Sequence, residues 1–265
     1  MKTKTLTTLL LFSSITYNAF SQFNLSITKY KWGIGASLGN VEVDDPQWNS
    51  WGYAKGNFYN FGDITNKSFS VSITPKYFIR KDVLLRLEFG IAKINLKYYW
   101  DSNAHLASNN SPTTDIINQN IQQNIYKFIP GVQWNFLSGK SIEAYLGMTV
   151  SYLHYSEMKY ENHRELRLLI NDSITGGLDD KATATGGFAV GAGAFTGANI
   201  YLQKHISLGA EISYSILYYD IGDTFSGEVV WLHNQAPSQT YSYFCSYKGF
   251  QSSTILASIN LSAWF

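Results

Sequence analysis

Charged side chains occupy regular places in this sequence, on the polar face of segments that alternate apolar and polar residues. If that face encloses a narrow interior, the charges could line a polar path for ions or small solutes. They could instead pair with one another and fill the space, since buried charges need partners. We expect the second arrangement, a salt-bridged plug, from a lumen charge network made of Lys31, Lys76, Arg86, Glu88, Lys127, Glu143 and Glu211.

Other reactive residue types give weaker signals. His154 and Ser156 are two residues apart in an alternating segment, so both should point to its apolar side. Cys245, the only cysteine, stands in an aromatic stretch with no convincing base beside it, which is typical of a packed residue. No set of His and acidic residues has a metal-ligand spacing, and no glycine-rich loop joins a strand to a helix. We therefore expect no metal, no cofactor and no enzymatic activity.

The composition suggests that much of the surface does not face water. The chain has 265 residues, of which 16% are aromatic and only 15% are charged, where an ordinary soluble domain has roughly 25% charged residues. A surface of normal size with so few charges is soluble only if part of it faces another medium. The net charge of +1 gives no reason to expect a nucleic-acid partner, which requires clustered Lys and Arg.

The first 21 residues have the pattern of a cleaved export signal. Lys2 and Lys4 precede a short apolar core, and Ala19 and Ser21 occupy the −3 and −1 positions of a cut before Gln22. A buried first strand or helix is the alternative. Elsewhere the sequence has no run of about 18 apolar residues, the length that a membrane-spanning helix needs. The mature domain is then 22–265.

Eight segments of this domain alternate apolar and polar residues over about nine residues or more, which strongly predicts strands. Near Ala92 and Lys93 the apolar residues change from one face of their segment to the other, and we expect a β-bulge there. Tight turns are expected at 80–82, 137–141 and 203–205, and long loops at 41–66, 101–120, 158–182 and 221–249. The eight segments cover residues 30–39, 69–77, 83–100, 126–136, 142–152, 187–200, 206–216 and 254–265.

Short turns on one side and long loops on the other are typical of an outer-membrane barrel, with the short turns in the periplasm. A water-soluble barrel of the lipocalin sort also alternates, but three features favour the membrane. The polar face is built mainly of Gly, Ser, Thr and Asn, which suit the cramped interior of an eight-stranded barrel. Tyr and Trp gather toward the strand ends, as interfacial girdles require. Finally, the chain ends at Phe265 within an alternating segment.

That last segment resembles the C-terminal assembly signal of bacterial outer-membrane proteins, a final aromatic preceded by apolar residues at every second position. Here Phe265 follows Ala263, Leu261 and Ile259, and Ala263 departs from the aromatic often found there. The whole mature chain resembles the small porin-like outer-membrane β-barrel proteins of Bacteroidota, of the OmpA and OmpX type. The resemblance implies an all-β, transmembrane, eight-stranded antiparallel up-and-down barrel. It also implies contact with outer-membrane lipid and with the barrel-assembly machinery.

The spacing of His154 and Ser156 is similar to that in the lipid A deacylase family of small barrels, in which the His activates the Ser against an acyl ester. The family's motif continues with Asn where this chain has Glu157, which puts the oxyanion-stabilising part in doubt. We expect a rim histidine among tyrosines and lipid headgroups instead.

Two of the expected loops are unusually aromatic. Such density outside the membrane means either loops that pack on one another or an adhesive surface for protein or sugar. The residues that we single out for interaction are Trp48, Trp51, Tyr53, Trp231, Tyr241 and Tyr243. We therefore expect a non-enzymatic barrel with a structural or interaction role, with a narrow solute channel or a lipid A deacylase-like hydrolase as alternatives.

Overall fold

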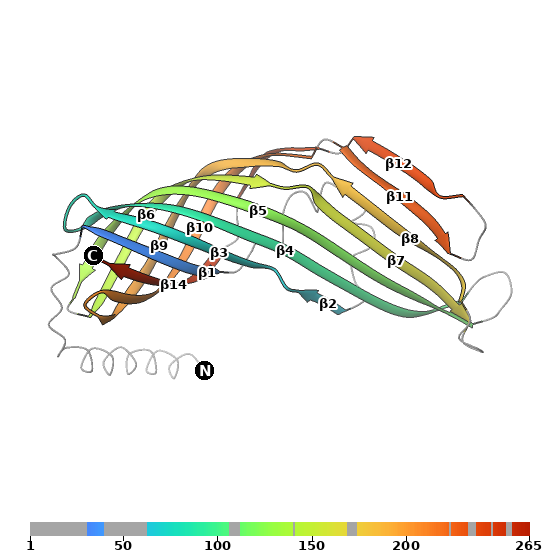
Figure 1. The fold of residues 1–265 in the computed structure, drawn as a ribbon, viewed down its shortest axis with the longest axis horizontal. Helices are drawn as coiled ribbons and strands as arrows, with labels where there is room; N and C mark the ends of the chain where they lie inside the picture. Colours follow the sequence, from blue (N-terminus) through green and yellow to red (C-terminus); the bar gives the residue numbers. More distant parts are fainter. Residues whose placement is uncertain are drawn as a thin grey trace, which may run out of the picture.

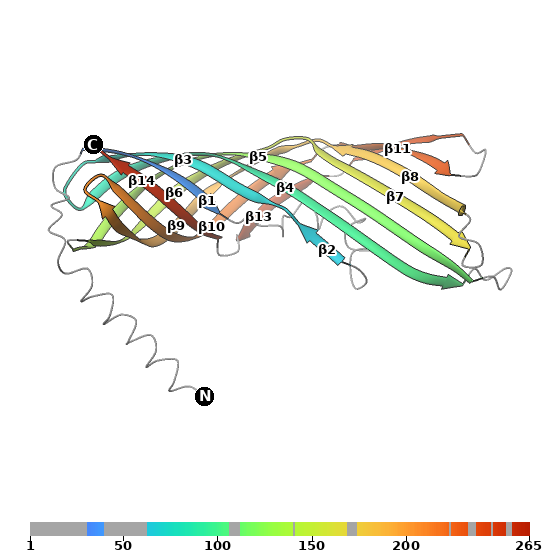
Figure 2. The ribbon, with the colours of Figure 1, turned by 60° about the horizontal axis from the view of Figure 1, so that its bottom comes forward.

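The computed structural model describes residues 31–39, 63–105, 112–139, 141–168, 174–222, 224–232, 237–244, 246–252 and 256–265. In these residues fourteen strands form one antiparallel sheet (Figures 1 and 2). No helix long and apolar enough to span a membrane occurs among them.

Eight strands close into a ring. Each pairs with the next in chain order, and the last pairs with the first over seven register positions, from Gly33↔Trp264 to Gly39↔Ser258. These ring strands are β1 (Trp32–Gly39), β3 (Phe69–Phe78), β4 (Val83–His105), β5 (Pro112–Ser138), β6 (Ile142–Tyr155), β9 (Gly187–Gln203), β10 (Ile206–Ile221) and β14 (Leu256–Trp264).

The sheet continues far beyond one end of the ring, toward the right of Figure 1. We call this part the sheet extension; it consists of the far halves of β4 and β5 together with four further strands in the order β5-β7-β8-β11-β12 and with β2 on the other side of β4. Besides these five strands, the short strand β13 (Tyr247–Ser252) also lies outside the ring and pairs with β10. The added strands are β2 (Asp63–Asn66), β7 (Met158–Leu168), β8 (Ile174–Ala184), β11 (Thr224–Leu232) and β12 (Gln239–Phe244).

The alternating segments are strands, and the three tight turns connect them where expected. The expectation of long loops at 101–120, 158–182 and 221–249 was wrong for most of these residues, which form strands. Short breaks separate them from the ring strands, at Ser156–Glu157 between β6 and β7 and at Thr185–Gly186 between β8 and β9. Backbone pairing therefore carries on above the ring, and eight strands describe the ring but not the whole sheet. Of the fourth expected loop, 41–66, only 63–66 lies within the described residues, as β2.

The bulge expected near Ala92 and Lys93 was also wrong. β4 keeps one register with β5 along its whole length and one register with β3 from Leu84 to Lys93. Even-numbered residues of β4 face inward on both sides of Ala92, and odd-numbered residues face outward. The surroundings of the strand change instead. Before Ala92 large apolar residues such as Phe89 and Ile91 are on the outer face, whereas after Ala92 the apolar residues Ile94 and Leu96 are on the inner face. A change of environment along an unbroken strand produced the apparent shift of phase.

The ring closes tightly because three of the four inward positions of β1 are glycines, at Gly33, Gly35 and Gly39. A Cβ on Gly33 would lie 2.5 Å from the indole ring of Trp264 on the neighbouring strand, which is too close for two carbon atoms. Trp264 fills the space that this glycine leaves, and its side chain is 1% exposed.

We expect Gly33→Val to destabilise the ring by about 1–3 kcal/mol, because overpacking at this seam must displace the Trp264 ring. The matched control is Ala36→Val in the same strand, on the outward face. Denaturant unfolding of the two variants in detergent micelles measures the difference. Equal stability of both variants would contradict the tight seam.

Candidate functional site

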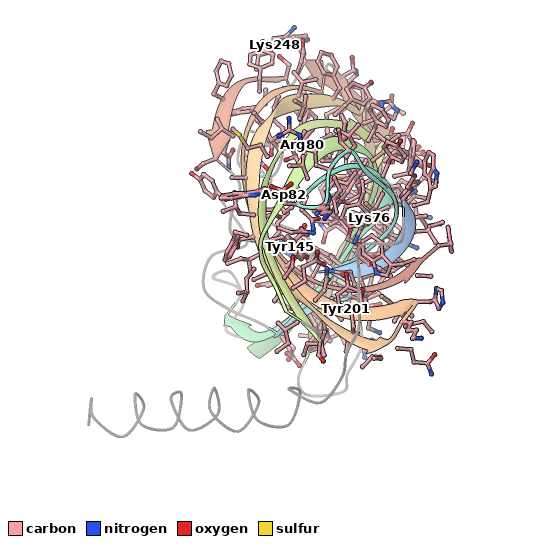
Figure 3. All side chains as sticks on the ribbon, turned by 90° about the vertical axis from the view of Figure 1, so that its left-hand side faces the viewer. Lys76, Arg80, Asp82, Tyr145, Tyr201 and Lys248 are labelled. Atoms are coloured by element: carbon pink, nitrogen blue, oxygen red, sulfur yellow. The ribbon has the colours of Figure 1, made fainter. Side chains whose placement is uncertain are left out.

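The end of the ring nearest the tight turns is filled by aromatic and amide side chains (Figure 3). Trp264 donates its indole N–H to Ser207 Oγ at 3.0 Å and packs beside Tyr201 and Phe78. Glu143, also 1% exposed, accepts a hydrogen bond from Tyr201 Oη at 2.9 Å. Its carboxylate is also bonded by the amide groups of Asn135 and Asn199. This end of the barrel is therefore closed by packed side chains.

The middle of the interior is held by an ion-paired arginine. Arg86 Nη1 donates to Glu211 Oε2 at 2.6 Å, and Nη2 lies 3.3 Å from Glu88 Oε2. Tyr145 Oη donates to the same Glu211 oxygen at 3.2 Å. The guanidinium stacks 4.3 Å from the ring centre of Phe195, so this cation joins β4, β9 and β10, and Tyr145 of β6 is linked to it through Glu211.

The two interior lysines have neutral partners. Lys76 Nζ donates to Ser262 Oγ at 3.0 Å and lies 5.3 Å from the Trp264 ring centre. Lys127 Nζ donates to Ser70 Oγ at 2.8 Å, reaching across β4 at Gly90, which stands opposite it and has no side chain. Neither lysine forms an ion pair with a described residue.

Six of the seven charges expected in the lumen thus lie on inward positions of the ring, three cations and three carboxylates. The structure brings only Arg86, Glu88 and Glu211 into one ion-paired group, and it places Glu143 among neutral donors instead. Lys31 was misplaced: its side chain is exposed just before β1. It precedes the first ring strand and so does not reach the enclosed face.

Sequence reasoning missed the interior aromatics. Tyr145, Phe195, Tyr201 and Trp264 are all buried inside the ring. Residues two apart on a strand face the same side. Tyr145 follows Glu143 by two residues and Tyr201 follows Asn199 by two, and both Glu143 and Asn199 are on the polar face that the sequence predicts to point inward. The alternation could therefore have found them, had the inward face not been assumed to consist of small polar residues.

Above the Arg86 group the ring encloses a cavity of about 130 Å³. Its floor includes Arg86, Glu88, Lys127 and Glu211, and its upper wall includes Ile125, Leu153, Tyr155, Leu217 and Tyr219.

An apolar cluster closes the inner face above this cavity and continues under the sheet extension. It joins the ring strands to β7, β8 and β11, so the extension is packed onto the barrel. The buried members are Ala92, Ile94, Ile121, Ile125, Tyr155, Met158, Tyr160, Ala182, Ala184, Ala189, Leu217, Tyr219, Ile221 and Phe225.

His154 and Ser156 are not joined by any hydrogen bond that the described structure contains. His154 points outward and stacks on Tyr126, with ring centres 6.1 Å apart. The Ser156 hydroxyl accepts from the backbone N–H of Asn124 and donates to the carbonyl of Glu157, both at 3.1 Å. The serine therefore caps the break between β6 and β7.

The outer face of the extension is polar and carries a histidine between two acids. His163 Nδ1 lies 2.5 Å from Asp179 and Nε2 lies 2.9 Å from Glu165. The hydrogen bond to Asp179 raises the pKa of His163 above its usual value, and that to Glu165 adds to it. On the inner face, Arg164 makes two hydrogen bonds to the buried carboxylate of Asp115. These pairs tie β5, β7 and β8 together.

The aromatic residues expected to form an interaction surface are only partly described. Trp48, Trp51 and Tyr53 lie outside the described residues. Tyr241 and Tyr243 of β12 pack against Phe225, with ring centres 5.9 and 5.0 Å away. Tyr241 Oη also donates to Asp180 at 2.7 Å. Trp231 of β11 is 39% exposed. In the described part, the two tyrosines serve the packing of the extension.

We expect Glu211→Ala to destabilise the barrel by about 3–5 kcal/mol, because it leaves the buried Arg86 guanidinium without its closer carboxylate. The double variant Arg86→Met with Glu211→Ala should recover much of that loss, since it removes both charges. Urea unfolding of the single and double variants tests the pair. A double variant less stable than the single one would show that the ion pair is not the reason.

No protein-family model matches the chain, and no curated protein matches it in sequence. Among solved structures, it is similar to the outer membrane protein OprG from Pseudomonas aeruginosa, at 11% identity and a TM-score of 0.42, over 89% of this chain and 96% of that one. It is similar to Neisserial surface protein A (NspA), at 13% and 0.38, over 88% and 97%. It is also similar to a major outer membrane protein from Thermus thermophilus, at 11% and 0.39, over 89% and 100%. At these scores the likeness carries no argument about function, which rests on the geometry of the chain itself.

Proposed function

We propose that the chain is an outer-membrane β-barrel protein without enzymatic activity, whose closed barrel holds the sheet extension outside the membrane for a structural or interaction role. The observation that carries the proposal is the contrast between the two faces of the ring. The outward face is a continuous apolar belt, and the inward face is filled by paired charges, amides and aromatics.

The belt has the chemistry of a lipid-facing surface. Every ring strand carries large apolar side chains on its outward face, and many of them are exposed: Met148 is 71% exposed, Ile259 63% and Val132 47%. Soluble proteins rarely expose contiguous apolar patches above a few hundred Å². A closed ring with such a surface is instead suited to hydrocarbon, where every backbone polar group must be paired internally.

The belt also has the right height. In β5 the outward residues are apolar from Tyr126 to Phe136, and the four outward positions before them, Asn118 to Asn124, are polar. Ten steps of about 3.3 Å make a length of about 33 Å, or about 25 Å of height at a tilt of about 40°, which is the apolar height of outer-membrane barrels. The neighbouring strand agrees, because Ile91 pairs with Tyr126 and Lys93 with Asn124. Aromatic residues mark both edges, with Tyr126 and Tyr152 above and Trp32 and Trp134 below.

The interior supports a closed barrel over the alternative of a narrow channel. Trp264, Tyr201 and Glu143 fill one end, and the Arg86 group fills the middle. The hydrolase alternative has less support, because the Ser156 hydroxyl is engaged with backbone groups and His154 is stacked on Tyr126.

The sheet extension supports an interaction role because it is packed against the barrel and held there by side-chain contacts. The apolar cluster and the Asp115–Arg164 and His163–Asp179 pairs hold its strands on the barrel. We propose a protein or glycan partner, with Trp231, Tyr243 and Phe244 among the exposed aromatic residues on this part. Export with cleavage before Gln22, and recognition of Ile259, Leu261 and Phe265 by the barrel-assembly machinery, belong to the same proposal. Those three side chains all face outward on the ring and are exposed.

We expect Val132→Arg to destabilise the folded protein in lipid vesicles by about 2–4 kcal/mol, the cost of a cation at the middle of the lipid-facing surface. Gln122→Arg is the control, ten residues earlier on the outward face of β5 and outside the belt. Folding into vesicles under a urea titration measures both. Equal effects of the two substitutions would contradict the membrane assignment.

We expect planar-bilayer recordings of the wild-type protein to show no steady conductance, because packed side chains interrupt the lumen. The same preparation should migrate differently on a cold gel before and after boiling, as closed barrels do, which controls for folding. A large, steady conductance from protein that passes this control would favour the channel alternative.

A further inference from the structure

The cavity inside the ring has a polar floor and a mainly apolar upper wall. A barrel with a purely structural role does not require such a cavity. Its volume of about 130 Å³ is close to that of engineered cavities of ~150 Å³ that hold one benzene molecule. An occupant of about six non-hydrogen atoms would therefore fill it.

The floor offers a cation whose charge is not neutralised by a direct partner. Lys127 lines the cavity and is bonded to the Ser70 hydroxyl, with no ion pair to a described residue. Beside it, Arg86 uses both terminal nitrogens for carboxylates, while its buried Nε has no hydrogen-bond partner. The Glu211 oxygen nearest Arg86 is also bonded by Tyr145. Only one N–H of the Lys127 ammonium has a described partner, the Ser70 hydroxyl, and its other N–H groups are donors that an anionic group could accept from.

The upper wall is built mainly of aliphatic and aromatic side chains. Leu153, Tyr155, Leu217 and Tyr219 face the cavity from β6 and β10. They belong to, or pack against, the apolar cluster and so are held in place by it. An occupant must carry its charge at one end and hydrocarbon at the other.

We propose that this cavity binds a short-chain monocarboxylate, with the carboxylate at Lys127 and the alkyl end under Leu153 and Leu217. The barrel is filled below the Arg86 group, so the occupant is bound rather than passed through. This site goes beyond the structural role proposed above.

The test is calorimetric titration of the folded barrel in nonionic detergent with butyrate, which has six non-hydrogen atoms. Butyramide has the same shape without the charge, acetate has the charge without the alkyl end, and butylammonium has the opposite charge. We expect butyrate to bind at least about tenfold more tightly than any of these three. Absence of measurable butyrate binding, or equal binding of butyramide or butylammonium, would overturn the proposal.

Two variants locate the site. Lys127→Met should abolish the preference for butyrate over butyramide, whereas Lys93→Met, on the outward face of β4, should leave it unchanged. Ser151→Phe should block binding by filling the cavity, because Ser151 is buried and lines it; Met148→Phe, outward on the same strand, is its control. If Lys127→Met fails to fold, Ser151→Phe decides the question. Butyrate binding that survives in a folded Ser151→Phe variant would place the ligand elsewhere and refute the site.

Discussion

The closure of β14 onto β1 is the constraint on which the rest of the structure depends. Hydrocarbon offers no partner to a backbone N–H or C=O, and each unsatisfied group there costs several kcal/mol. The seven register pairs between these two strands remove the free edges of the ring. Their spacing requires Gly33 opposite Trp264, and the indole in turn seals one end of the interior. The packing of Trp264 against Gly33 therefore both joins β14 to β1 and fills one end of the lumen.

β4 and β5 run from the ring into the sheet extension, so their outer faces pass through two environments, and this explains what the sequence could and could not predict. The period of two identifies strands whatever surrounds them, so the ring strands and their tight turns were predictable. Hydrophobicity alone cannot distinguish a lipid-facing residue from one in a water-covered core. The apolar residues of β4 therefore seemed to change phase at Ala92, although the backbone pairing is regular there. The outer faces of β7 and β8 are polar, with Lys159, His163 and Lys181. For the same reason the sequence predicted loops there.

The interior was predictable in its charges but not in its contacts. Alternation indicates that Arg86, Glu88 and Glu211 face inward, because each follows the parity of its own strand. Which charges meet depends on the stagger between strands that are distant in sequence, and alternation contains no information about that stagger. Lys127 is an example: it reaches Ser70, 57 residues away, only because Gly90 stands between them without a side chain.

The same stagger divides the interior into levels with different chemistry. The inward aromatics and amides of the lower level leave no room, and the Arg86 group above them satisfies its own carboxylates. The apolar cluster at the top excludes water because it must hold the sheet extension to the ring. Between these two levels the inward residues of β1, β9 and β10 are small, such as Ser37, Gly193 and Ser215, and side chains from one wall do not reach the other. The cavity therefore follows from joining a charged plug to an apolar core in one barrel, and Lys127 lies at the boundary where the two meet.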